Sequence, residues 1–260
     1  MTIFLALVLF SSCRKVIELD LKDNEPKFVI EGFITNEPGT CKVSISQSKN
    51  FYDDNQFEGI SGAQVSIKDN GTEYNLVETN AGVYENTAIT GVPGHVYELS
   101  VTIGNEEFTA TSSMPQPVTI DSLYISKGPF GQFLFPTITY TDPAGINNGY
   151  RFVQYLNGVK DPAIFWNDDE LTDGQSVVLR LDSGIDREDD PRNIKSGDLV
   201  QVDLLTLDEP ILRFWYTLST GGGDGGGQII APSNPVTNIQ GGALGYFSAH
   251  TISSKSVIVP

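Results

Sequence analysis

The sequence is poor in cysteine, in histidine and in positive charge. Its 260 residues include two cysteines, two histidines and 16 basic residues against 33 acidic ones, which gives a formal net charge of −17. A surface with this excess of negative charge repels the phosphates of nucleic acids and anionic lipid head groups. We therefore expect no nucleic-acid partner, and any membrane attachment must come from something other than a basic face.

The apolar run near the start, Ile3–Phe10, is too short to cross a membrane. It has eight residues, whereas a transmembrane helix needs about 20. Its length is typical of the apolar core of a secretory signal peptide, and Ser11 and Ser12 supply small residues before Cys13. Cys13 stands where the lipoprotein-processing enzyme would cut and where a diacylglycerol would be attached.

We therefore predict a lipoprotein signal peptide over residues 1–12 and a lipidated tether over residues 13–26 that begins at Cys13. The protein would then be attached to a membrane through this lipid, at its periplasmic or cell-surface face. A lipoprotein's diacylglycerol, usually joined by an amide-linked acyl chain, holds a protein durably, whereas one acyl chain holds it only marginally. The alternative is an ordinary signal peptide followed by an incidental cysteine.

The chemistry-bearing residues form no recognisable catalytic motif. With Cys13 lipidated, Cys41 has no disulfide partner, and we expect it to be a half-buried thiol at the start of a strand. His95 and His250 are the only histidines, and their spacing places neither beside Cys41. The sequence has no nucleophile elbow, phosphate-binding loop or histidine-based metal motif. We predict no enzymatic activity and no cofactor.

Two acidic segments could in principle bind calcium through carboxylate oxygens. They are "NDDELTD" at residues 167–173 and "DREDDP" at residues 186–191. Neither has the regular ligand spacing of a calcium loop, so we interpret both as solvated acidic loops and predict no metal site.

Apolar and polar residues alternate along most of the chain, the pattern of half-buried strands. The clearest cases are "KFVIEGFIT", "CKVSISQS", "AQVSIKD", "YELSVTIG" and "EFTATSSM". Later in the chain, "SVVLRLDSG" and "DLVQVDLLTLD" are two predicted strands with longer apolar faces. Asn70-Gly71, Gly104-Asn105 and Asn157-Gly158 are two-residue turn signals, because Gly and Asn tolerate the positive φ that tight hairpins need. The sequence therefore predicts an all-β protein rich in hairpins.

Pro115 and Pro117 interrupt the strand patterns and mark a domain border. We predict two domains: an antiparallel β-sandwich of the immunoglobulin type over 27–115, able to fold alone, and a larger β domain over 118–260. The second domain should contain one amphipathic helix near 209–219. Asp208 would be its N-cap, and Ile211, Phe214, Trp215 and Leu218 recur at helical spacing.

Several stretches together resemble a known family. They are "CRKVIELDL", "EPKFVIEGFIT", "GAQVSI", "GVYE" and, most specifically, "NPVTNIQGGALGYFSAHTIS". They are similar to the Bacteroidota lipoproteins catalogued as domain of unknown function 4249. The first half also resembles the transthyretin-like or carboxypeptidase-regulatory sandwich. The resemblance implies outer-membrane lipoproteins without an established activity, often encoded beside TonB-dependent transporters.

The expected function is that of a non-catalytic accessory or ligand-binding component, beside a TonB-dependent outer-membrane barrel. Candidate contact residues are Phe130, Phe133, Asn234, Asn238 and Tyr246. The alternatives are that the phenylalanines pack inside the second domain, and that the asparagines and Tyr246 belong to a loop fixed on the terminal strand. At the level of function, a surface adhesin or structural interaction module is the alternative, and an enzyme comes third.

Overall fold

The structure, a computed structural model, describes residues 25–49, 56–128, 133–185, 187, 189–221 and 234–260. Within these residues the chain is almost entirely β, with one helix, which confirms the predicted fold class. The elements discussed first are β1 (Phe28–Thr35), β2 (Cys41–Gln47), β5 (Val77–Asn80), β6 (Val83–Glu85), β11 (Gly149–Leu156), β12 (Val159–Lys160), β13 (Phe165–Asp168), β15 (Leu199–Leu207) and β17 (Leu244–Ile258).

These strands form one nine-stranded sheet that extends through both halves of the molecule. Its order is β12-β11-β15-β17-β1-β2-β6-β5, with β13 also paired to β11. The long strand β17 joins the two halves. Its first part pairs in parallel with β1, and its second part pairs antiparallel with β15.

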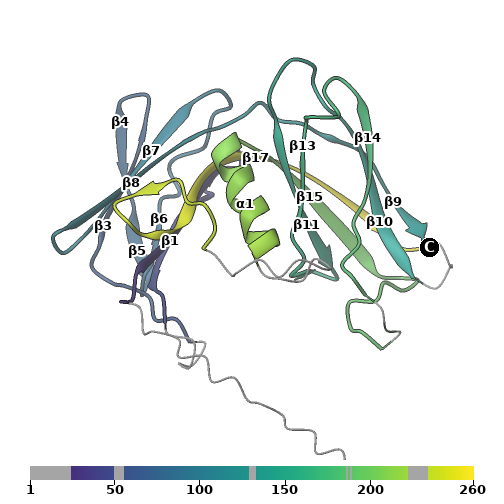
Figure 1. The fold of residues 1–260 in the computed structure, drawn as a ribbon, viewed down its shortest axis with the longest axis horizontal. Coiled ribbons are helices and arrows are strands. Elements are labelled where there is room, and N and C mark those ends of the chain that lie inside the picture. Colours follow the sequence, from purple (N-terminus) through teal and green to yellow (C-terminus); the bar gives the residue numbers. More distant parts are fainter. Residues whose placement is uncertain (1–24, 50–55, 129–132, 186, 188, 222–233) are drawn as a thin grey trace, which may run out of the picture.

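Two smaller sheets cover one face of the large sheet. The first has the order β16-β8-β7-β3-β4 and the second β14-β10-β9. Their strands are β3 (Gln64–Asp69), β4 (Thr72–Asn75), β7 (Val96–Ile103), β8 (Glu106–Ser113), β9 (Ile120–Lys127), β10 (Leu134–Thr141), β14 (Ser176–Arg180) and β16 (Ile239–Gln240). In Figure 1 they lie at opposite ends of the molecule.

The direction of the β17 side chains shows that both small sheets lie on the same face. Side chains alternate between the two faces along a strand. Phe247 and Ala249 are buried in the core under the first small sheet, and Val257, an even number of residues further on, packs in the core under the second. The molecule is therefore two sandwiches side by side that share one continuous sheet.

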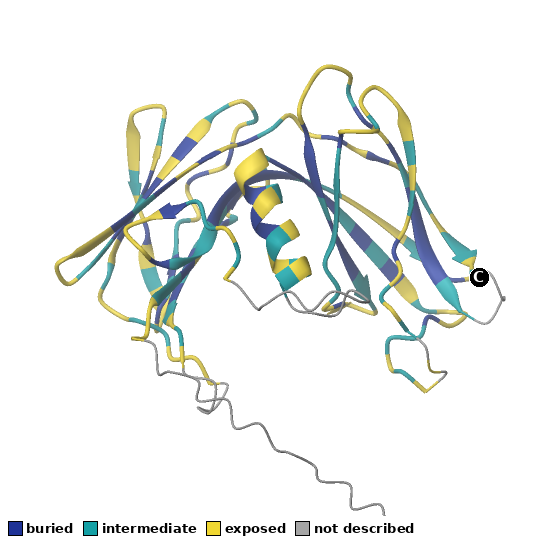
Figure 2. Ribbon diagram, in the orientation of Figure 1, coloured by how far each residue is buried: buried dark blue, intermediate teal, exposed yellow. Residues whose placement is uncertain are grey.

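The helix α1 (Glu209–Gly221) covers the opposite face of that sheet, which we name the helix face. It contacts β11, β13 and β17 and buries Ile211, Phe214 and Trp215 against Leu205 and Leu207. One side of α1 is buried and the other exposed (Figure 2). The helix predicted near 209–219 is confirmed, although Leu218 is 36% exposed rather than in the core.

The half-buried carboxylate of Asp208, just before α1, ties the helix to β8. Its Oδ2 accepts hydrogen bonds from Ser112 Oγ (2.9 Å) and the Ser113 amide (2.8 Å). Burial raises the pKa of Asp208, and the amides of Ser113 and Ile211 lower it in part. The predicted N-cap thus also connects the helix to the first small sheet.

The predicted hairpins form for the expected reason. Asn70-Gly71 joins β3 to β4 and Asn157-Gly158 joins β11 to β12, with positive φ at both residues of each turn. At Gly104-Asn105, which joins β7 to β8, positive φ occurs at Gly104. Local turn chemistry alone was enough to place these strand pairs.

The first sandwich differs from the predicted 27–115 unit in its composition. Its core also includes Ile239, Ala243, Phe247 and Ala249, from beyond the predicted border. β16 pairs with β8, and the pairing of β1 with β17 is parallel, not antiparallel. Residues 239–249, which we assigned to the second domain, complete the first sandwich.

The close approach of β1 and β17 predicts an unequal effect of two glycine substitutions. Gly245 and Gly242 both have positive φ, so alanine is strained at either position by about 1–2 kcal/mol. At Gly245 the new Cβ would also lie 2.0 Å from the Ile30 carbonyl oxygen, whereas at Gly242 nothing lies within 4 Å. Gly245→Ala should therefore lower the free energy of unfolding by clearly more than Gly242→Ala, as measured by urea denaturation. Equal losses would contradict this account of the pairing.

Candidate functional site

The structure does not bring the predicted contact residues into one cluster. Cys13 and Phe130 lie outside the described residues. Phe133 is half-buried just before β10, and its carbonyl accepts a hydrogen bond from the Gly128 amide (2.9 Å). Asn234 is exposed, whereas Asn238 and Tyr246 are half-buried near the start of β17.

Asn238 holds the segment before β17 onto the sheets. Its Nδ2 donates to the carbonyls of Thr111 (3.1 Å) and Phe247 (2.8 Å), and its Oδ1 accepts from the Phe247 amide (3.0 Å). The side chain thus uses both donor and acceptor groups on the backbone of β8 and β17. These contacts support the structural interpretation of Asn238.

The two asparagines should therefore differ in their effect on stability. Asn238→Ala removes three hydrogen bonds and leaves partly buried backbone groups without partners, so it should cost about 1–3 kcal/mol of unfolding free energy. Asn234→Ala, at an exposed position, should stay within about 0.5 kcal/mol of the original chain. Thermal or urea unfolding checks both variants. Similar values for the two would mean that the Asn238 bonds contribute nothing.

Tyr246 points to the helix face and joins an aromatic cluster. Its ring centroid lies 4.7 Å from that of Phe214 and 5.2 Å from that of Trp215. Burial raises the pKa of Tyr246 to about 12, so its hydroxyl stays protonated at neutral pH. Among the predicted contact residues that the structure describes, Tyr246 is the one found beside a charged group.

That charged group is Arg151, which sequence reasoning missed. Arg151 lies on β11 with its guanidinium carbon 3.4 Å from the centroid of the Trp215 ring. The side chain is half-buried, and its Nε is buried without a hydrogen-bond partner. No ion pair of Arg151 is found in the part of the chain that the structure describes. We call Arg151, Trp215, Phe214 and Tyr246 the Arg151 cluster.

Other ionisable groups act on this cluster. Burial lowers the pKa of Arg151, and the nearby Tyr246 and Tyr155 oppose that shift. Burial also lowers the pKa of Lys160, on β12, and the positive charge of Arg151 lowers it further, while Glu31 raises it. Arg151 and Lys160 are thus close enough to repel, and Glu31 is the acidic group that acts on Lys160.

A signal for Arg151 is present in "YRFVQYLNGVK". Arg151 lies on the same strand face as Val153 and Tyr155, which belong to the apolar layer under α1. A charge at such a position is unusual for a half-buried strand. The sequence alone did not show that a helix would cover that face, so the position looked like an ordinary exposed one.

His250 and Cys41 are not available as a base or a nucleophile. His250 is buried on the helix face, where its Nδ1 is hydrogen-bonded with Ser248 Oγ (2.9 Å). Burial, assisted by the charge of Arg151, lowers its pKa to about 3. Cys41 is fully buried rather than half-buried as expected, and burial raises its pKa to about 12. A neutral buried imidazole and a protonated buried thiol have structural roles here.

The buried imidazole predicts acid sensitivity. Since the pKa of His250 is lowered in the folded state, the unfolded chain binds a proton at this residue between pH 6.5 and about 3, and the folded chain does not. Stability should therefore fall as the pH drops through this range. His250→Gln should reduce that fall, measured as the difference between urea midpoints at pH 7 and pH 4.5. Both proteins have the same carboxylates, so if the difference between the two midpoints is the same in both proteins, His250 does not contribute to the acid sensitivity.

Aspartates of the first acidic segment bind backbone amides. Asp169 Oδ2 accepts from the Asn148 amide (2.8 Å) and Asp173 Oδ1 from the Gly145 amide (2.6 Å). In the second segment Asp186 and Glu188 lie outside the described residues, and Asp190 pairs with Arg192 at 2.8 Å. Among the described residues no group of three or more His, Cys, Asp or Glu side chains could hold a metal ion.

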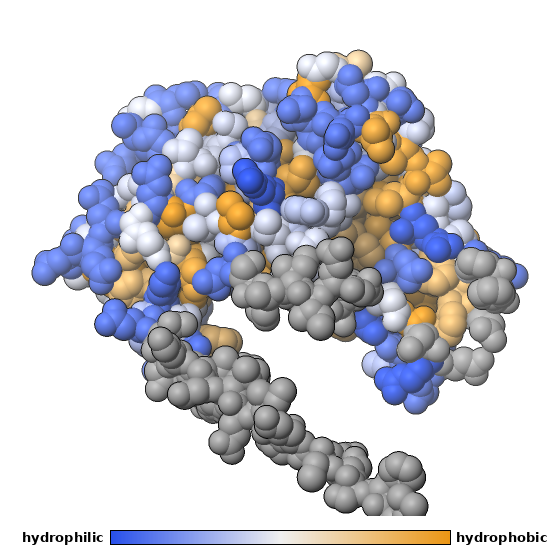
Figure 3. Space-filling model, in the orientation of Figure 1, coloured by the Kyte–Doolittle hydropathy of each residue, from blue (hydrophilic) through white to orange (hydrophobic). Residues whose placement is uncertain are grey.

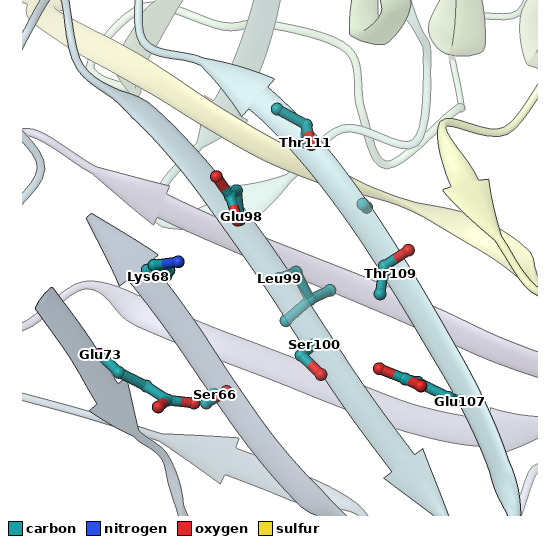
Figure 4. Close-up of a pocket in the computed structure, with 10 residues that line it drawn as sticks. Ser66, Lys68, Glu73, Glu98, Leu99, Ser100, Glu107, Thr109 and Thr111 are labelled. Atoms are coloured by element: carbon teal, nitrogen blue, oxygen red, sulfur yellow. The ribbon is translucent and has the colours of Figure 1, made fainter. Parts of the chain in front are cut away.

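Apart from the Arg151 cluster, a polar groove lies on the outer face of the first small sheet. A shallow groove of about 330 Å³ there is lined by Ser66, Lys68, Glu73, Glu98, Leu99, Ser100, Glu107, Thr109, Ala110 and Thr111 (Figure 4). Lys68 lies opposite Glu73 and Glu98 in the strand register. The groove offers hydrogen-bonding groups, but its lining includes no aromatic ring and no predicted site residue.

The surface shown in Figure 3 is mostly hydrophilic, and hydrophobic side chains gather mainly over the C-terminal half, by which we mean residues 118–260. Exposed apolar residues of that half include Tyr124 on β9, which is 43% exposed, and Val178 on β14, which is 64% exposed. Among the described residues, no helix is long and apolar enough to span a bilayer.

Comparison with known proteins identifies the family. The model of the domain of unknown function DUF4249 matches residues 14–256, so the chain belongs to this family. No curated protein matches the sequence. Among solved structures, a crystal structure described as a "putative carbohydrate binding protein" from Bacteroides uniformis ATCC 8492 has 12% sequence identity. The match covers 69% of this chain and 88% of that chain, and the TM-score of 0.24 is too low to support an argument about fold or ligand.

Proposed function

We propose that this family member is a lipid-anchored outer-membrane protein that binds a ligand without transforming it, as an accessory component beside a TonB-dependent barrel. The observation that carries the ligand-binding part is the Arg151 cluster. It combines a half-buried cation that has no ion-pair partner among the described residues with a wall of aromatic rings. Aromatic rings with a few placed polar groups are typical of ligand sites.

The non-catalytic part rests on the state of two potentially reactive side chains, His250 and Cys41. A general base needs a pKa near the working pH and access to its substrate. His250, with a pKa of about 3, has neither. The Cys41 thiol, buried in the core of the first sandwich, would have to lose its proton there to act as a nucleophile.

The anchor rests on Cys13 and on the extent of the family match. The match begins at residue 14, directly after Cys13, as expected if the mature chain begins at that cysteine. The family resemblance supplies the barrel as the candidate partner. An acidic, non-catalytic protein held at the membrane would act by contact, and the exposed apolar residues of the C-terminal half are the candidate contact surface.

Cys13→Ser should release the protein from the membrane fraction and abolish incorporation of an alkyne-labelled fatty acid. Cys41→Ala is the matched control, because it removes the other cysteine and leaves the predicted lipidation site intact. The control should stay in the membrane fraction and keep the label. Retention of Cys13→Ser in cells that lack any neighbouring barrel would contradict the lipid anchor.

Crosslinking in intact cells tests the partner separately. Reagents for both amines and carboxylates are needed, because acidic residues outnumber basic ones by 33 to 16. Repeated recovery of a TonB-dependent barrel supports the accessory role. Failure to recover one from a strain that expresses the neighbouring barrel would favour a free-standing surface module, such as an adhesin.

A further inference from the structure

Arg151 differs from the other arginines in the described part of the chain. Arg180 and Arg192 lie near aspartates, at 3.7 Å and 2.8 Å. Arg187 and Arg213 are exposed to solvent. Arg151 alone is half-buried without a carboxylate partner, in a chain with twice as many acidic as basic residues. Holding a cation out of water without a counter-charge is unfavourable, so its presence calls for a compensating interaction.

We propose that Arg151 binds the carboxylate of a small ligand, whose body lies against the half-buried ring of Tyr246 on the helix face. The inference names the ligand class of the proposed function and rests on its ligand-binding part. The guanidinium carbon of Arg151 lies over the Trp215 ring, 3.4 Å from its centroid, which is the distance of a stacked contact. A stacked guanidinium is fixed in orientation and still presents N–H donors at its edge, and this fork matches the two oxygens of a carboxylate.

The surrounding charges favour a carboxylate over a phosphate. Lys160 adds a second positive charge within electrostatic range of Arg151, while Glu31 acts on both Lys160 and Tyr246. Opposing negative charge from Glu31, in a chain with a net charge of −17, penalises a doubly charged phosphate more than a singly charged carboxylate. Trp215 and Phe214 are buried, so the half-buried ring of Tyr246 is the one that can contact the rest of the ligand.

Binding at Arg151 can be followed through tryptophan fluorescence. The chain has two tryptophans: Trp215 lies under the Arg151 guanidinium, and Trp166, on β13, is opposite Arg151 in the strand register. In a Trp166→Phe background, the emission of Trp215 can be titrated with two carboxylate probes, D-glucuronate and 4-hydroxybenzoate. Their neutral counterparts, D-glucose and phenol, and inorganic phosphate serve as comparisons. The protein is the full chain, purified in mild detergent.

At least one carboxylate probe should change the Trp215 emission with a dissociation constant of about 1 mM or lower, the range open to a small ligand with one strong contact. Its neutral counterpart and phosphate should bind at least about 10-fold more weakly. Arg151→Met keeps the packing on Trp215 and removes the charge, so it should weaken carboxylate binding about 10- to 100-fold.

Arg180→Met is the matched control. Arg180 also lies over an aromatic ring, with its guanidinium carbon 4.8 Å from the Phe135 centroid, but it is partly exposed and near Asp182. This variant should bind the carboxylate probe like the original chain. Circular dichroism and thermal unfolding confirm that both variants are folded, and isothermal calorimetry repeats the titration without a fluorescent readout.

Three results would overturn the inference: no response to either carboxylate, equal binding of the neutral counterpart or phosphate, or unchanged carboxylate binding by Arg151→Met. The first and third would mean that Arg151 only packs on Trp215. None of them bears on the lipid anchor, which the Cys13→Ser fractionation tests separately. If neither carboxylate binds in the titration, and Cys13→Ser is nevertheless released from the membrane fraction, the ligand class is rejected and the lipoprotein assignment stands.

Discussion

The pairing of β17 with two different partners is the constraint on which the rest of the structure depends. One strand of 15 residues runs parallel to β1 over its first part and antiparallel to β15 over its second. The large sheet is continuous only because this strand crosses from one sandwich to the other. Gly245 permits the close approach to β1, since a side chain there would meet the Ile30 carbonyl. The two cores are therefore coupled through a shared backbone, and the border between them lies within a strand.

The candidate site follows from this arrangement. Both small sheets pack on one face of the large sheet, so the apolar side chains of the other face must be buried by a different element. The helix α1 covers them, and its aromatic residues meet Tyr246 from β17 and Arg151 from β11. The Arg151 guanidinium is thereby placed between the sheet and α1, which come from segments far apart in the sequence. The same layer encloses His250, so the histidine is neutral because the fold excludes water from it.

Stability and binding make different demands on these residues. The donor and acceptor groups of the Asn238 side chain are hydrogen-bonded to backbone groups of β8 and β17, as is typical of a residue with a structural role. Arg151 does the reverse, because its Nε is buried without a partner and burial lowers its pKa. Unfavourable local arrangements of this kind concentrate at functional sites, where a ligand compensates for them. Of the predicted contact residues, Asn238 falls in the first group, and Tyr246, beside Arg151, falls in the second.

The sequence by itself determined the features that depend on near neighbours. Alternation of apolar and polar residues placed most strands, Asn-Gly pairs placed two hairpins, and the spacing of Ile211, Phe214 and Trp215 placed the helix, because each depends on a few consecutive residues. Only the tertiary structure decided that β17 pairs with β1, since the choice of a distant strand and its direction is a matter of global packing. For the same reason Arg151 could not be identified beforehand. An arginine in an alternating strand looks solvent-exposed until the helix that covers it, more than fifty residues later in the chain, is in place.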